Sequence, residues 1–130
     1  MRKNQHLITL AFAASLLASP AFAAPQLDKE IAAAAQHAGL AAQGGDIAEV
    51  HTHLHHTINC LVGPKGEGFA PKEMNPCSAL GNGAIPDAAE GQKKSLKAAL
   101  VVANKGVAET DFEKAKAGAT ETQSMLSTIK

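Results

Sequence analysis

The chain has 130 residues, with 12 acidic and 12 basic side chains. This neutral balance, with scattered lysines, lacks the basic patch of nucleic-acid-binding proteins, so we do not expect nucleic acid as a partner. Alanine supplies much of the apolar content, and Trp and Tyr do not occur. Side chains this small predict a thin hydrophobic core.

Residues 1–23 have the features of a secretory signal peptide. Met1-Arg2-Lys3 is a basic start, residues 7–17 are apolar apart from Thr9 and Ser15, and Ala21-Phe22-Ala23 matches a cleavage site. The apolar run is shorter than the roughly 20 residues that a bilayer-spanning helix needs. We therefore expect export to the periplasm, no membrane span, and a single mature domain over residues 24–130.

Apolar residues at helical spacing predict four helices in the mature chain. Two of these helices precede a long Gly- and Pro-rich segment, and two follow it. Acidic or hydroxyl residues three positions before a glutamate, as in Asp46 and Glu49, indicate capping boxes at the starts of the last three helices. The predicted ranges are about 26–43, 46–62, 87–107 and 110–129.

The segment between the second and third helices, residues 63–86, has no helical or strand periodicity. Cys60 and Cys77 are the only cysteines. In an oxidising, exported context they predict a disulfide that ties this segment to the second helix, the alternative being two thiolate ligands. The expected fold is all-α, an alanine-rich antiparallel four-helix bundle with a disulfide-tied loop between its second and third helices.

Four of the six histidines lie within residues 51–56. His51 and His55 are one helical turn apart on the flank of the apolar stripe, so their rings can point at one site. In an antiparallel hairpin, His37 of the first helix is level with His51. The preferred metal site is therefore His37, His51 and His55, a set of imidazoles that suits zinc or copper.

A second candidate set lies on the opposite, outward face of the same helix. It comprises Glu49, His53 and His56, with Cys60 as a further ligand only if that thiol is reduced. His53 and His56 could bind a metal alone or across a homodimer. The sequence contains no catalytic motif, so we do not expect an enzyme.

Two other uses of the histidines stay open. Because imidazoles titrate near neutral pH, the histidine-rich face can serve as a pH-sensing surface or dock an unidentified periplasmic partner. A helical bundle can also hold haem b through axial histidines, although C-x-x-C-H, the motif for covalent haem, does not occur.

The stretch from His37 to His51 resembles the histidine-bearing helical hairpins of small periplasmic metal-binding proteins. Those proteins are exported helical bundles that bind copper, nickel or zinc through many spaced histidines, and the resemblance covers about residues 32–56. It implies a periplasmic protein for metal buffering, delivery or tolerance. Because this chain has fewer histidines, and none in its last two predicted helices, we expect one or two sites.

Overall fold

The computed structural model describes residues 24–130, and their secondary structure is entirely helical. This confirms the predicted all-α class. The predicted signal peptide lies outside the described residues. Four helices are long and one is a single turn, so the expected count of four was too low. The helices are α1 (Leu27–Ala42), α2 (Ile47–Val62), α3 (Ala84–Asp87), α4 (Glu90–Ala108) and α5 (Phe112–Ser127).

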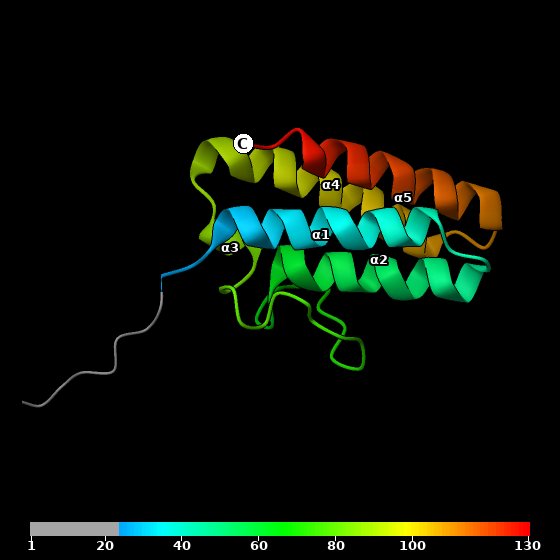
Figure 1. The fold of residues 1–130 in the computed structure, drawn as a ribbon, viewed down its shortest axis with the longest axis horizontal. Helices are drawn as coiled ribbons and strands as arrows, with labels where there is room; N and C mark the ends of the chain where they lie inside the picture. Colours follow the sequence, from blue (N-terminus) through cyan, green and yellow to red (C-terminus); the bar gives the residue numbers. More distant parts are fainter. Residues whose placement is uncertain (1–23) are drawn as a thin grey trace, which may run out of the picture.

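The four long helices pack side by side, with consecutive long helices antiparallel (Figure 1). Helix α1 contacts α2 and α5, and α4 contacts α5 and α2. The short helix α3 lies against α1, α2 and α4. The segment between α2 and α3 runs along α2 on the side away from α5, where Figure 1 shows it in green.

The core is built largely from alanine, as the composition predicts. Small side chains allow the helices to approach closely: a Cβ at Gly106 would lie 2.7 Å from Leu54 Cδ1, and one at Gly118 would lie 3.3 Å from Gly106 Cα. Close approach recovers dispersion contacts that large side chains would otherwise supply. The largest fully buried apolar side chains are Leu54, Ile58, Leu61, Leu96 and Leu126.

The capping box at the start of α2 is confirmed. Asp46 Oδ1 accepts a hydrogen bond from the Glu49 N–H at 2.9 Å, and Glu49 Oε2 accepts one from the Gly45 N–H at 2.8 Å. Together these bonds satisfy two backbone donors at the helix start. Glu49 is therefore occupied in the α1–α2 turn.

The other two predicted capping boxes are wrong. Asp87 lies within α3 and accepts hydrogen bonds from the backbone and side chain of Asn82, so α4 begins only at Glu90. In α5 the capping residue is Asp111, whose side chain accepts from the Lys114 N–H, rather than Thr110. Both four-residue patterns matched the motif. However, the Asp87 carboxylate bonds to Asn82, and Asp111 caps α5 in place of its neighbour Thr110.

The long loop, residues 63–83, is held firmly against α2. The predicted disulfide between Cys60 and Cys77 is present. The Asn59 side chain, fully buried, accepts from the Ala70 N–H and donates toward the carbonyl oxygens of Ala70, Glu73 and Met74. Together, the disulfide and Asn59 fix the loop on the side of α2 away from α5, the face that the sequence predicts to be outward.

A buried carboxyl group connects the end of this loop to α1. Glu30 is fully buried, its Oε1 accepts from the Gly83 N–H at 3.0 Å, and its Oε2 has no hydrogen-bond partner among the described residues. Burial raises the pKa of Glu30; the Gly83 hydrogen bond opposes this shift, and the nearby Asp87 carboxylate reinforces it. Both carboxyl groups lie against Gly81, which leaves no room for a Cβ there.

Glu30→Gln is expected to stabilise the protein at neutral pH by about 1 kcal/mol, because it replaces a carboxyl group whose ionisation is disfavoured by burial with a neutral amide that can donate to Asp87. A raised folded-state pKa stabilises the fold most at acidic pH, and that contribution is lost as pH rises through the folded pKa. The gain should therefore disappear at acidic pH. Denaturant unfolding across a pH series would measure it, with the exposed Glu121→Gln as control; a pH-independent difference would contradict this account.

Candidate metal centre

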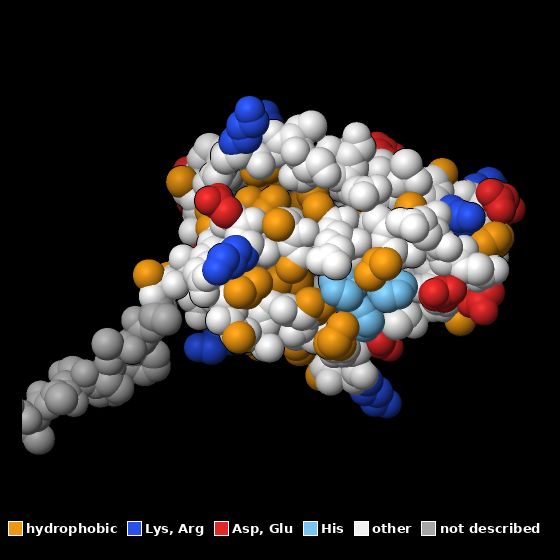
Figure 2. Space-filling view, viewed as in Figure 1, with side chains coloured by type: hydrophobic (Ala, Val, Ile, Leu, Met, Phe, Trp, Pro, Cys, Tyr) orange, Lys and Arg blue, Asp and Glu red, His pale blue; other side chains and the backbone are white. Residues whose placement is uncertain are grey.

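Three histidines from two helices meet on one face of the protein. His37 belongs to α1, and His53 and His56 belong to α2. One ring nitrogen of each lies within 4.8 Å of those of the other two. His37 Nδ1 and His53 Nδ1 are 3.3 Å apart. In Figure 2 the histidine side chains form a pale-blue patch where α1 and α2 lie side by side.

Local structure explains why these three meet. His53 and His56 are three residues apart and therefore neighbours on the α2 surface. Thr57, one turn beyond His53, donates a buried hydrogen bond from Oγ1 to the Ala34 carbonyl at 3.1 Å. That bond joins the same flank of α2 to α1 about one turn before His37. The helix contact therefore brings His37 onto His53 and His56.

The three rings pack against one another. The ring centroids of His37 and His56 are 5.1 Å apart and those of His53 and His56 are 5.4 Å apart, both edge to face. His56 is buried, with 7% of its surface exposed, whereas His37 and His53 are half-buried. An ion could therefore reach the cluster from the side of His37 and His53, with His56 at its base.

The environment favours neutral imidazoles. Burial, reinforced by His56 and His53, lowers the pKa of His37. Burial and His53 lower the pKa of His56, while the Glu73 carboxylate partly opposes the shift. A metal binds the neutral imidazole, so lowered pKa values keep the lone pairs available at neutral pH and below.

His56 has different surroundings at its two ring nitrogens. Its Nε2 lies 3.7 Å from Glu73 Oε2 on the loop, whereas its Nδ1 is buried with no hydrogen-bond partner among the described residues. In metalloproteins, a ligating histidine usually directs its second ring nitrogen to a carboxylate or carbonyl. Glu73 is placed to take this role if His56 ligates through Nδ1.

The spacing fits a small tetrahedral ion after a modest adjustment. Zn–N bonds of 2.0–2.1 Å in a tetrahedron separate two ligand nitrogens by about 3.3 Å. The His37–His53 pair already has this separation, at 3.3 Å. The remaining nitrogen pairs, within 4.8 Å, would have to close by ring rotation. Three imidazoles would leave a fourth position for water or another ligand.

The structure separates the histidines that the sequence analysis had grouped. Of the preferred set, only His37 joins the cluster. His51 Nε2 instead lies 2.9 Å from the Glu109 carbonyl at the α4–α5 turn, and His55 Nδ1 is buried without a partner among the described residues. The predicted convergence of His37, His51 and His55 is therefore not observed, because α1 packs on the other flank of the α2 apolar stripe.

The second candidate set is also rearranged. His53 and His56 do lie together, but not on a fully outward face: α1 packs beside them, and the loop lies against His56, which is buried. Cys60 is fully buried in the disulfide. Glu49 is bonded to Gly45 instead. Glu73, which the sequence analysis missed, sits in an irregular loop with no periodicity to indicate where it points.

No family model, curated protein or solved structure matches the chain. The resemblance to periplasmic histidine-bearing hairpins therefore stays a prediction. Among the described helices, none is long and apolar enough to cross a membrane. The histidine cluster is therefore the feature of the molecule that bears on its function.

Proposed function

We propose that this is an exported periplasmic protein that binds one divalent transition metal ion through His37, His53 and His56, for buffering, delivery or tolerance. The observation that supports the proposal is the convergence of three ring nitrogens within 4.8 Å from residues far apart in the chain. Three imidazoles held by two packed helices need little reorganisation to bind an ion. Folding has already ordered these side chains, so metal binding loses little further conformational entropy.

The donor set narrows the choice of metal. Imidazole suits copper, nickel and zinc, whereas magnesium and calcium prefer oxygen ligands. The general order of divalent affinities places copper above both nickel and zinc. We therefore expect the tightest binding for Cu²⁺, and a single ion per chain.

Export to an oxidising compartment fits the remaining features. Disulfides persist in the periplasm and are rare in the cytosol, and the Cys60–Cys77 bond closes the loop that carries Glu73. The signal-peptide pattern of residues 1–23 points to the same compartment.

The test compares two double variants with the same number of substitutions. His37→Ala/His53→Ala removes two members of the cluster, and His51→Ala/His55→Ala removes two histidines outside it. Titration calorimetry and native mass spectrometry with Cu²⁺, Ni²⁺ and Zn²⁺ would measure affinity and stoichiometry. Because losing one supporting partner of a ligand typically weakens binding 10–100-fold, we expect the first variant to lose more than about 100-fold.

The control variant should bind with the parent's stoichiometry and nearly the parent's affinity. Circular dichroism would confirm that both variants remain folded. Equal loss in both variants, or no binding by the parent, would contradict the proposed site. A Soret band after haem addition to the parent would favour the haem b alternative.

The lowered pKa values of His37 and His56 support a second candidate, a pH-sensing or partner-docking surface. The two functions differ in their response to a chelator. A pH sensor should change stability or self-association between about pH 5 and 8 with chelator present, since imidazoles titrate in that range. A metal-binding protein should respond to the metal itself.

A further inference from the structure

A cavity lies apart from the histidine cluster, between the end of α2, the helix α3 and the helix α4. It has a volume of about 750 Å³, and none of its lining residues is a histidine. Small-molecule sites generally have volumes of about 300–1,000 Å³. The cavity is therefore large enough for an organic ligand, and metal binding gives it no role.

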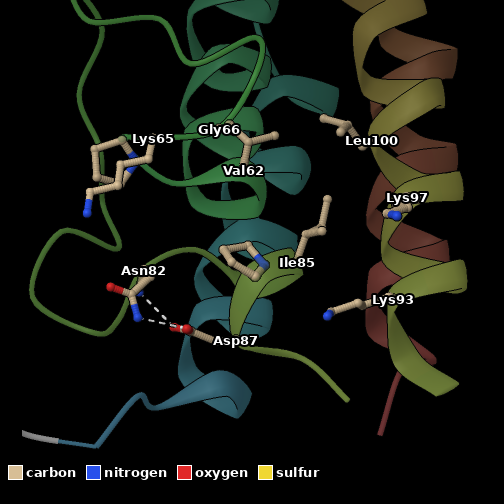
Figure 3. Close-up of a pocket in the computed structure, with 11 residues that line it drawn as sticks. Val62, Lys65, Gly66, Asn82, Ile85, Asp87, Lys93, Lys97 and Leu100 are labelled. Atoms are coloured by element: carbon tan, nitrogen blue, oxygen red, sulfur yellow. Dashed lines mark hydrogen bonds between the residues drawn. The ribbon is translucent and has the colours of Figure 1, made fainter. Parts of the chain in front are cut away.

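The inner wall of the cavity is apolar. Figure 3 shows Val62, Ile85 and Leu100 directed into the space between α3 and α4. Val62 is buried, and Ile85 and Leu100 are half-buried. Pro64 and Pro86 extend this lining at its edges. Such a surface favours a ligand with a hydrocarbon portion.

The rim of the cavity is cationic. Lys93 and Lys97 stand four residues apart on α4, and Lys65 lines the cavity from the loop. Like charges at this helical spacing repel one another, which an anion between them would relieve. Lys93 also contacts Glu90, at 2.8 Å, but that glutamate is exposed.

Asp87, the acidic residue of the lining, is already hydrogen-bonded within the protein. Asp87 accepts two hydrogen bonds from Asn82, at 2.7 and 2.8 Å, and these are drawn as dashed lines in Figure 3. Within residues 24–130, neither Lys65 nor Lys97 has an acidic partner within ion-pair distance. Lys65 and Lys97 are therefore available to a ligand, and Lys93 pairs only with the exposed Glu90.

From this combination we propose that the cavity binds a small amphipathic anion, namely a free carboxylate carrying a hydrocarbon chain. The chain would lie along Val62, Ile85 and Leu100, and the carboxylate would lie at Lys93 and Lys97. A partly buried carboxylate needs a cationic partner, which this rim supplies. The proposal is independent of the metal site.

The probe for this site is decanoate, used below its micelle concentration with the mature protein. Calorimetry would give the affinity, and amide NMR shifts would show whether Val62 and Ile85 respond. Decanol has the chain without the charge, and inorganic phosphate has the charge without the chain. We expect decanoate to bind most tightly of the three and to shift the signals of the cavity residues.

Two lysine variants separate the site from general charge. Lys93→Gln/Lys97→Gln should weaken decanoate binding about tenfold and leave decanol unchanged, because two charge-assisted contacts are lost. Lys94→Gln/Lys105→Gln removes two lysines of the same helix that do not line this cavity, and should have little effect. Equal binding of decanol, equal weakening in both variants, or shifts away from the cavity would each overturn the proposal.

Discussion

Removing the disulfide by Cys60→Ala/Cys77→Ala is expected to lower the free energy of unfolding by about 3 kcal/mol. The bond spans 17 residues, and closing a loop of this length restricts the unfolded chain by about that amount in the chain-entropy account. Alanine is preferable to serine because both positions are buried and a hydroxyl there would need a partner. Denaturant unfolding would measure the change.

The same variant should weaken metal binding. The disulfide and Asn59 hold the loop on α2, and that loop places Glu73 Oε2 3.7 Å from His56 Nε2. A carboxylate behind a ligating histidine orients the ring and raises its basicity, and losing it typically weakens binding 10–100-fold. Because Asn59 still tethers the loop in the variant, we expect about tenfold.

Glu73→Gln separates the two effects of the disulfide. It keeps the bond, so the free energy of unfolding should change little, while metal affinity should still fall. If Cys60→Ala/Cys77→Ala lost stability but kept the parent's metal affinity, the loop would have no part in the site. If Glu73→Gln also bound metal as well as the parent, Glu73 would be a surface residue only.

The sequence was sufficient to predict the apolar stripe of α2, but not that His56 and Cys60, on the face predicted to be outward, are buried as well. Val50, Leu54, Ile58 and Leu61 recur at helical spacing, and all four are buried. Helices α1 and α2 begin and end within a residue of the predicted bounds. The strong local signals are Gly44-Gly45 between the two helices, Asp46 at the start of α2 and Gly63 at its end. The sequence also predicted that His37 lies opposite the middle of α2, because the turn between α1 and α2 is short.

What periodicity could not decide is which neighbour lies on which flank of that stripe. Helix α1 can pack on either flank of the apolar stripe. On one flank His37 would lie beside His51 and His55, and on the other it lies beside His53 and His56. The buried Thr57–Ala34 hydrogen bond and the His51–Glu109 contact reveal the actual choice. Both involve residues distant in sequence, so no local pattern predicts them.

The loop was beyond sequence reasoning for a related reason. Its course depends on partners such as Asn59 and Glu30, which look like ordinary polar helix residues yet are fully buried. Asn59 precedes Cys60 directly, and that adjacency was the one available hint that it faces the loop. The capping box at Asp87 was wrongly predicted for the same reason: its carboxylate accepts hydrogen bonds from Asn82 in the loop, which the four-residue pattern does not reveal.

Metal should stabilise the folded protein strongly at neutral pH and hardly at all in acid. A ligand that binds only the folded state at 100 times its Kd adds about 2.7 kcal/mol to the free energy of unfolding. Protons compete for the same imidazoles, so this gain should shrink as pH falls toward 5. Denaturant unfolding with zinc or chelator, across a pH series, would measure both curves.

The chelator-treated protein should show a pH dependence of its own. The folded-state pKa values of His37 and His56 are lowered, so the unfolded chain binds more protons and stability is lost as pH falls through the folded values. His53 faces both rings and adds to the shift, whereas Glu73 opposes it at His56.

A matched pair of variants assigns these curves to the cluster. His37→Gln/His56→Gln should flatten the pH dependence of the chelator-treated protein and abolish the zinc effect, while His51→Gln/His55→Gln should change neither by much. The pH dependence and the zinc effect can also be observed independently of each other. A flattened curve without any zinc effect in the parent would favour the pH-sensing function over metal binding, because the rings of His37 and His56 would then titrate without ligating an ion.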